Sequence, residues 1–320
     1  MARVAVIIPV FNGAETVGDA IDSVLAQSFR DFESIVVDDG STDATPAVLE
    51  RYGGAIRVIT QPNAGISAAR NAALRASASE FVALLDCDDV WRPAMLERSV
   101  AALDRDGSCV LVYTNLEITD SNGTSLNTSL VGAATAHAPT LDEMLTQLWP
   151  IMPSAVVMRR RALEAIGGFA EEFRSYGYED AYCWLRLREI GGFHYIPEPL
   201  VKWRFAPFPR PLKRVSPNPQ AQATFARLVR ERWGRSVEPL LRSRRRASRS
   251  ILGYIGLMEL RNGNSRRARE AFRRALSLDP LRFKNYLRLL RTYLPAAVAR
   301  TLGGRTTHRV PRPERSPRDI

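Results

Sequence analysis

Short apolar runs alternate with amphipathic stretches along the first 105 residues of the chain. The apolar runs, rich in β-branched residues, lie at 4–9, 34–39, 56–60 and 81–86, and the amphipathic stretches lie near 16–27, 44–52, 66–77 and 93–103. Continuous apolar runs of this length are typical of strands with both faces buried, and the stretches between them are typical of helices that cover a parallel sheet. The pattern therefore predicts an α/β fold: a mostly parallel sheet with helices on both faces.

The alternation becomes less regular after residue 105. Strands are predicted at 109–114 and 154–159, with helices near 140–149 and from Glu179 onward. The proline-rich stretch at 206–219 ends this pattern, because proline continues neither a helix nor a sheet ladder. We therefore divide the chain into an α/β domain at 1–210, with halves 1–105 and 106–210, a Pro/Arg-rich linker and helix at 211–249, a small all-α segment at 250–296, and a disordered basic tail at 297–320.

The all-α segment has the spacing of one tetratricopeptide unit. The matching positions are Leu252, Ile255, Gly256, Ala268, Phe272, Ala275 and Pro280, with leucine in place of the usual tryptophan. A single helical hairpin does not bury its own faces, so we expect it to pack on the rest of the chain, on a helix near 282–294, or on a protein partner.

Charge is distributed unevenly along the chain. The net charge of +11 is the sum of −12 over residues 1–200 and +23 over residues 201–320. The basic part is expected to face something anionic, and peripheral attachment to the inner face of the cell membrane is predicted. Three scattered cysteines, and the absence of a signal-peptide pattern at residues 1–13, favour a cytoplasmic location.

Polar residues follow the ends of the four predicted N-terminal strands. They are Asn12, Asp38 and Asp39, Asn63, and Asp86 with Asp88. Ligands of parallel α/β sheets bind beyond the carboxyl ends of the strands, so one crevice would receive all of these side chains. The alternative is that each residue caps a helix or forms a turn, which is the commonest role of Asp and Asn at such junctions.

Three carboxylates, Asp86, Asp88 and Asp89, follow the fourth apolar run directly. Like charges this close repel unless a cation or a proton joins them. Carboxylate oxygens suit Mg²⁺ or Mn²⁺, which take one or two protein carboxylates together with substrate phosphates. We interpret Asp89 as a cap for a helix that begins near Pro93, with a second-ligand role as the alternative.

Five segments resemble, in order and spacing, the motifs of the inverting family 2 glycosyltransferases. They are VIIPVFNGAETVGDAIDSVLAQSF, IVVDDGSTDAT, NAGISAARN, FVALLDCDD and GYEDAYCWLRL, and together they span about residues 4–205. The resemblance implies a GT-A (Rossmann-like) fold that joins a nucleotide-sugar half to an acceptor half. It also implies a nucleotide-sugar donor, with UDP-sugars favoured, and a saccharide or lipid-linked acceptor in cell-surface polysaccharide synthesis.

The resemblance also implies roles for individual residues. Asp180 would be the general base that takes the acceptor proton, and Asp88 a direct metal ligand with Asp86 reaching the metal or the ribose. Acceptor contacts are expected from Glu179, Tyr178 and Trp203, whereas Trp184 is interpreted as either a sugar contact or a core residue. The expected donor contacts are Pro9, Val10, Phe11, Asn12, Glu15, Asp39, Asn63, Arg70, Asp86 and Arg204.

The chain departs from the family pattern in one segment. Members often show an aromatic-Arg-x-His sequence after the ED helix, and here the segment reads Trp203-Arg204-Phe205-Ala206, so the histidine is missing. Arg204 is the expected replacement contact to the diphosphate. The Q-x-x-R-W motif of processive synthases is also missing, which favours transfer of one sugar per encounter.

Two other functions compete with this interpretation. DCDDV, residues 86–90, fits the D-x-D-x-[TV] motif of haloacid-dehalogenase-like phosphatases, but that motif normally follows the first strand, not the fourth. A basic interaction protein that binds nucleic acid or an anionic membrane through residues 201–320 is the second alternative. For a glycosyltransferase, no nucleic-acid partner is expected.

Overall fold

The computed structural model describes residues 2–119, 125–129, 136–147, 149–173, 177–204, 219–261, 263–281 and 283–294. These residues separate into two compact units, one that ends at Arg244 and one that begins at Arg245. All of the predicted site residues lie in the first unit. Residues 205–218, which include Ala206 and nearly all of the proline-rich stretch at 206–219, lie outside the described residues, as does the whole predicted basic tail at 297–320.

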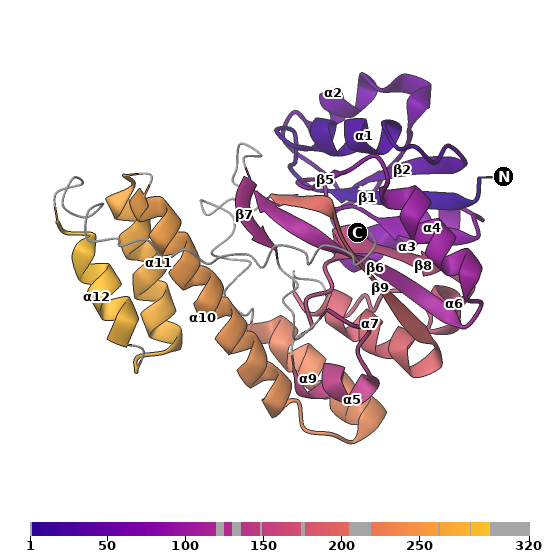
Figure 1. The fold of residues 1–320 in the computed structure, drawn as a ribbon. Helices are drawn as coiled ribbons and strands as arrows, with labels where there is room; N and C mark the ends of the chain where they lie inside the picture. Colours follow the sequence, from indigo (N-terminus) through magenta and orange to yellow (C-terminus); the bar gives the residue numbers. More distant parts are fainter. Residues whose placement is uncertain are drawn as a thin grey trace, which may run out of the picture. The chain divides into compact units, whose positions relative to one another are not determined.

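The first half of the sheet is parallel, as predicted. Its strands are β1 (Val4–Val10), β2 (Phe32–Asp38), β3 (Arg57–Thr60) and β4 (Phe81–Leu84), in the order β3-β2-β1-β4 (Figure 1). The connection from β1 to β2 runs toward the β3 edge of the sheet, whereas the connection from β3 to β4 runs back past β2 and β1. Because such crossovers are right-handed, the helices of these two connections cover opposite faces. The sheet therefore has helices on both faces, with strand ends at one edge.

The predicted helices of this half are all present. They are α1 (Val17–Leu25), α2 (Thr45–Glu50), α3 (Ile66–Ala76) and α4 (Met95–Arg105). A 3-10 turn (Gly53–Ala55) follows α2. The buried side chains of α3 include Ala69 and Ala73, whose small size lets this helix lie close against β1 and β2.

The second half of the sheet mixes strand directions. Its strands are β5 (Val90–Trp91), β6 (Cys109–Thr119), β7 (Ser125–Ser129), β8 (Val156–Arg159) and β9 (Gly192–Arg204). β8 is antiparallel to both β4 and β6, whereas β9 is parallel to β6 and antiparallel to β5. The described part of the sheet thus has nine strands, and β8 joins the two halves into one layer.

Helices pack around this second half. They are α5 (Leu141–Thr146), α6 (Arg160–Ala165), α7 (Glu179–Ile190) and α9 (Pro219–Trp233), with a 3-10 turn at Pro153–Ala155. Phe225 of α9 is completely buried and its ring stacks on that of Tyr178, with centroids 4.9 Å apart. The first unit therefore extends beyond residue 210 and includes α9.

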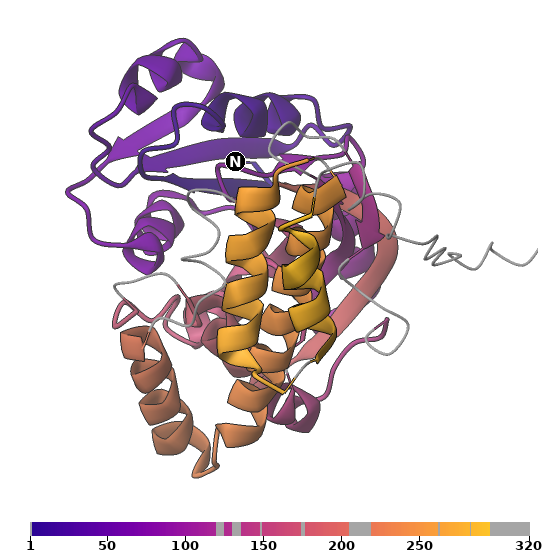
Figure 2. The ribbon, with the colours of Figure 1, turned by 90° about the vertical axis from the view of Figure 1, so that its left-hand side faces the viewer.

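The second unit is helical. It contains the C-terminal part of α10 (Glu238–Arg261), followed by α11 (Ser265–Leu278) and α12 (Phe283–Arg291), and α12 lies beside α11 (Figure 2). A Cβ on Gly256 would lie 2.5 Å from the ring of Phe272, so glycine lets α10 and α11 approach closely. The expected hairpin is present, and its tetratricopeptide character stays a prediction. No helix in the described residues is long and apolar enough to cross a membrane.

Candidate functional site

Asn12 joins the carboxyl ends of β1 and β2. Its φ of 51° lies in the left-handed region, which asparagine tolerates better than most residues. Its side-chain oxygen accepts hydrogen bonds from the N–H groups of Thr42, at 2.8 Å, and Asp43, at 3.3 Å. Asn12 therefore fixes the loop after β2, as expected for a residue that shapes the predicted donor site.

Asp39 fixes the loop that precedes α3. It is buried, and its carboxylate accepts hydrogen bonds from the N–H groups of Ala64 and Gly65, both at 2.9 Å, and from the side chain of Gln61 at 2.7 Å. The exposed Asn63 lies in this same loop. The structure thus places Asp39 and Asn63 at the same loop, and the three hydrogen bonds that Asp39 accepts there are structural.

The residues at the carboxyl end of β1 and just beyond it differ in exposure. Pro9 and Val10 are buried in the strand, whereas Phe11 is 48% exposed and Glu15 is exposed. An exposed aromatic ring beside fixed loops offers a surface on which a flat base can stack. Phe11 and Glu15 therefore remain accessible to a ligand, whereas Pro9 and Val10 are buried and the carbonyl of Val10 accepts the N–H of Asp39 at 2.9 Å.

Arg70 joins the two predicted carboxylate pairs. Its guanidinium has no exposed surface; it lies 3.0 Å from Oδ1 of Asp86 and 3.5 Å from Oε1 of Glu179. Its guanidinium carbon also lies 5.4 Å from the ring centroid of Phe169, at a cation–π distance. Arg70 therefore forms a buried ion pair with Asp86, and its expected contact with the donor stays a prediction.

Asp89 does not cap α4. That helix begins at Met95 and its N-cap makes no side-chain hydrogen bond. The carboxylate of Asp89 instead accepts hydrogen bonds from the hydroxyl of Ser154, at 2.5 Å, and from the N–H of Arg204, at 3.0 Å. Asp89 therefore ties the loop after β4 to the segment before β8 and to the end of β9.

The three acidic side chains interact with one another. Burial raises the pKa of Asp89 well above its usual value, and the charges of Asp88 and Asp86 raise it further. The hydroxyl of Ser154 accepts the N–H of Asp86 at 3.0 Å, which places this loop firmly. The three carboxyl groups thus lie close enough to interact, as the sequence predicted, and burial favours the neutral form of Asp89.

The donor set fits a divalent cation that the substrate helps to bind. In the described residues, no group of three or more His, Cys, Asp or Glu side chains has the geometry of a protein-only metal site. Asp86 and the partly exposed Asp88 offer the one or two carboxylates that Mg²⁺ or Mn²⁺ takes when phosphates complete its coordination. The residues present therefore fit the expected ion.

Glu179 and Asp180 begin α7 and have different environments. Their charges are favoured at the N-terminus of a helix. Glu179 is buried, and burial together with the charge of Asp180 raises its pKa to about 7, whereas Arg70 lowers it. Asp180 is only half-buried and accepts the N–H of Ala181 at 2.7 Å. Asp180 is the member of the pair that an acceptor can reach.

The aromatic residues of the predicted acceptor site differ in accessibility. Tyr178 is only 2% exposed, so its ring packs in the core against Phe225 and does not offer a face to a sugar. Trp184 is also a core residue, and its indole N–H donates to the carbonyl of Ile151. Trp203 is partly exposed and remains the candidate for stacking.

Arg204 lies at the end of β9, beside the acidic loop. Its N–H binds Asp89, and its guanidinium donates to Oδ2 of Asp19, on α1, at 2.7 Å. The exposed Asp19 would compete with a diphosphate for this guanidinium.

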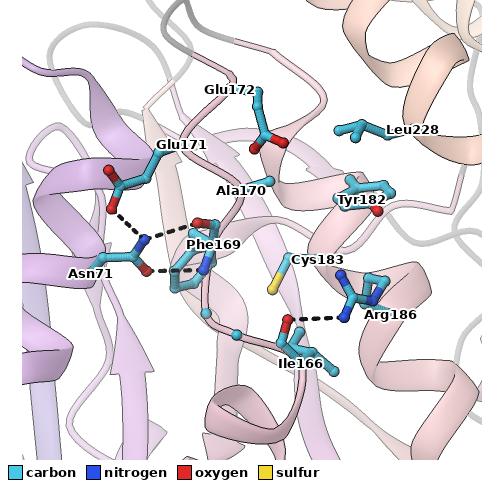
Figure 3. A pocket seen from close by; sticks show the side chains of 12 residues that line it. Asn71, Ile166, Phe169, Ala170, Glu171, Glu172, Tyr182, Cys183, Arg186 and Leu228 are labelled. Atoms are coloured by element: carbon cyan, nitrogen blue, oxygen red, sulfur yellow. Dashed lines mark hydrogen bonds between the residues drawn. The ribbon is translucent and has the colours of Figure 1, made fainter. Parts of the chain in front are cut away.

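A pocket of about 360 Å³ lies beside α7 (Figure 3). Its wall includes residues 166–172, which Asn71 holds through two hydrogen bonds to the backbone of Phe169, at 2.8 and 2.9 Å. Tyr182, Cys183 and Arg186 form the α7 side of the pocket. Sequence analysis did not assign this pocket; the only signal was the Gly-Gly pair at 167–168, where Gly168 has a φ of 76° and faces Asn71.

Comparison with known families gives an independent result. The model of "Glycosyl transferase family 2" matches residues 5–167, which is half of the chain. The chain belongs to glycosyl transferase family 2. This family 2 match includes β1 to β8 and the acidic loop, and it ends before α7.

Several bacterial relatives of this family 2 chain are glycosyltransferases by name. An uncharacterized glycosyltransferase of Rickettsia prowazekii is 28% identical over 63% of each chain. The putative glycosyltransferase EpsE of Bacillus subtilis is 28% identical over 63% of this chain and 73% of its own, and the putative teichuronic acid biosynthesis glycosyltransferase TuaG of the same species is 35% identical over 42% and 53%. The chain spans less than two thirds of the Rickettsia prowazekii relative and 34% of the one from Rickettsia felis.

Solved structures show the same fold. S. aureus TarS 1–349 superposes with a TM-score of 0.60 at 20% identity, covering 94% of this chain and 91% of that chain. Its complex with UDP-GlcNAc gives a TM-score of 0.62 at 17% identity. The predicted GT-A-like α/β fold is thereby confirmed.

Proposed function

We propose that this family 2 chain is an inverting, metal-dependent glycosyltransferase. It would move one sugar from a UDP-sugar to a hydroxyl of a saccharide or lipid-linked acceptor in cell-surface polysaccharide synthesis. The names of TuaG and of the TarS complex with UDP-GlcNAc support this substrate class. The observation that carries the proposal is the position of Arg70 between Asp86 and Glu179, because it brings the predicted donor and acceptor carboxylates into one site.

Donor binding would use the exits of β1, β2 and β4. Asn12 and Asp39 hold the loops after β2 and before α3, and Ser154 holds the acidic loop, so these segments would meet the nucleotide without further ordering. Asp86 and Asp88 would hold Mg²⁺ or Mn²⁺ against the diphosphate, and the bound ion would stabilise the charge of the leaving group. Arg70 keeps Asp86 in place during this process.

Sugar transfer would use Asp180 as the general base. Its half-buried carboxylate takes the proton of the acceptor hydroxyl, and the hydroxyl oxygen forms a bond to the anomeric carbon. The bond from that carbon to the diphosphate breaks on the opposite side, and its electron pair leaves with the nucleoside diphosphate. The configuration at the anomeric carbon is therefore inverted, and Asp180 later releases its proton to water.

Acceptor binding would use Trp203 and the pocket beside α7, whereas the buried Glu179, which was expected to contact the acceptor, would act only through its contact with Arg70. That pocket borders the helix that carries Asp180 and is lined by several polar side chains (Figure 3). Arg204 would contact the diphosphate after leaving Asp19. The α10–α11 hairpin is proposed as a tetratricopeptide-like site for a protein partner, and the enzyme is proposed to act in the cytoplasm at the inner face of the membrane.

Calorimetric titration with nucleoside diphosphates and nucleotide sugars tests the proposal. The wild type should bind a uridine nucleotide only when Mn²⁺ is present, and Asp88→Ala should lose this binding. Asp142→Ala is the matched control, because Asp142 is an exposed carboxylate in the first turn of α5. Absence of nucleotide binding by the wild type would favour the basic interaction protein, and phosphate release from a phosphomonoester would favour the phosphatase.

A further inference from the structure

α12 carries a row of exposed apolar side chains. Phe283, Leu287 and Leu290 are 76%, 65% and 64% exposed, and Leu294, in the turn after the helix, is 38% exposed. Their spacing of four, three and four residues places them on one side of a helix. Single exposed apolar residues are ordinary, but a continuous stripe marks a surface that is covered by something else. We call these four residues the apolar stripe.

The opposite side of α12 holds the helix in its own unit. Asn285 and Thr292 are each 1% exposed, and Leu289 packs against the cluster of Leu260, Ala268 and Phe272. This side attaches α12 to α10 and α11. Among the described residues, the apolar stripe therefore stays largely exposed when the second unit packs.

Basic residues lie along both edges of the stripe. Lys284 and Arg291 follow helical spacing on one edge, whereas Arg288 lies nearer the packed side, where its guanidinium donates to the buried Asn285 at 3.2 Å. Tyr286 and Tyr293 lie on the other, and two arginines of α11 extend it: Arg273 donates to the hydroxyl of Tyr293 at 2.9 Å, and the guanidinium of Arg269 lies 4.5 Å from its ring centroid. The sequence from 283 to 294, FKNYLRLLRTYL, contains no acidic residue.

We propose that α12 inserts its apolar stripe into the surface of an anionic lipid bilayer. A short amphipathic helix with Phe and Leu on one face and Lys and Arg beside it lies in the plane of the interface, with its apolar face at the acyl boundary. The long arginine and lysine side chains reach back to the headgroup phosphates, and tyrosine is enriched at the same depth. A second copy of the chain is a poorer occupant, because a face-to-face pair would oppose two basic rims.

This inference deepens the proposed attachment to a membrane, since it names the helix and adds insertion to charge. It rests on the proposed glycosyltransferase function in one respect: membrane insertion would hold the enzyme near a lipid-linked acceptor. Vesicle binding is measured without donor or acceptor, so its outcome is separate from that of the nucleotide titration.

Co-sedimentation of the full chain with vesicles is the first test. The wild type should bind phosphatidylglycerol/phosphatidylethanolamine vesicles and bind phosphatidylcholine vesicles at least tenfold more weakly. The double substitution Leu287→Ser/Leu290→Ser should weaken binding to the anionic vesicles at least tenfold and leave nucleotide binding unchanged. Ile190→Ser is the control, because Ile190 is a 47% exposed apolar residue of the first unit. Equal binding by wild type and double variant would overturn the proposal.

Depth of insertion is the second test. Leu290→Trp should gain a blue-shifted emission component on anionic vesicles that brominated lipids quench, measured as a difference from the wild type. An unshifted, unquenched signal would show that charge alone holds the chain, and would overturn insertion. Sedimentation velocity without vesicles gives the remaining outcome: self-association that the double variant abolishes would assign the stripe to a second copy instead.

Discussion

The guanidinium of Arg70 lies 3.0 Å from the carboxylate of Asp86 and has no exposed surface. The pair links the first turns of α3 to the end of β4, and a second contact at 3.5 Å links it to Glu179 at the start of α7. Removing one member of a buried ion pair leaves its partner's charge uncompensated, which is more costly than loss of an exposed pair.

Substitution of Arg70 by alanine is therefore expected to destabilise the first unit by about 3–5 kcal/mol and to weaken nucleotide binding. Arg75→Ala is the matched control on the same helix, because its pair with Glu171 is exposed and its loss should change stability by less than about 1 kcal/mol. Urea denaturation measures both. Similar small changes in the two variants would contradict the structural role given to Arg70.

Asp180→Asn is expected to lower kcat by about 10²–10⁴-fold without a change in stability. Asparagine keeps an oxygen that can accept the N–H of Ala181, so the start of α7 should be preserved, but it does not take a proton. Initial rates of nucleoside diphosphate release measure the effect. Glu164→Gln is the control, because Glu164 is an exposed carboxylate of α6. Wild-type turnover in Asp180→Asn would remove this residue from the role of base.

Glu179 makes stability depend on pH. Burial raises its pKa from 4.5 to about 7, so between these values the folded chain holds a proton that the unfolded chain has released. Wild-type stability should therefore fall as the pH rises through this window, and the penalty should be complete above pH 7.

Glutamine imitates the protonated form of Glu179, so Glu179→Gln should gain stability relative to the wild type by up to about 3 kcal/mol between pH 4.5 and 8. Urea titrations at both pH values give the difference. A difference that does not vary with pH would mean that Glu179 is ionised throughout.

Asp89→Ala is expected to destabilise the first unit by about 1–3 kcal/mol, because the hydroxyl of Ser154 and the N–H of Arg204 would lose a buried acceptor. Asp89→Asn should lose less, since it retains an acceptor oxygen. Thermal unfolding compares the two. The alanine variant should also bind Mn²⁺-nucleotide more weakly, because the loop that carries Asp86 and Asp88 loses its Asp89 contacts with the turn before β8 and with the end of β9.

The N-terminal half of the fold was predictable because its signals are local. Each buried parallel strand is a continuous apolar run, and each helix has its own periodicity, so β1 to β4 and α1 to α4 follow from the sequence. The segment that became β9 contains Pro197 and Pro199 and was not identified as a strand. In the structure the pairing register jumps from Ile196 to Pro199, and the prolines are tolerated at this irregularity.

The residues of the candidate site were predictable from the sequence, but the contacts between them were not. Asp86, Glu179 and Arg70 were named from motifs, whereas the burial of Arg70 depends on contacts between residues more than 100 positions apart. Asp89 was assigned to the nearest helix because local capping is the commonest role of such an aspartate. Its actual partner, Ser154, is 65 positions away, and no local pattern indicates that contact.

The position of β8 has a consequence for synthesis of the chain. β8 lies between β4 and β6, although it follows both in the sequence. Until the ribosome has produced residue 159, the four completed parallel strands end at an unpaired apolar edge, β4, and such an edge is a template for pairing with other chains. Newly made protein should therefore be most prone to aggregate, or to need a chaperone, while residues 85–159 are being added.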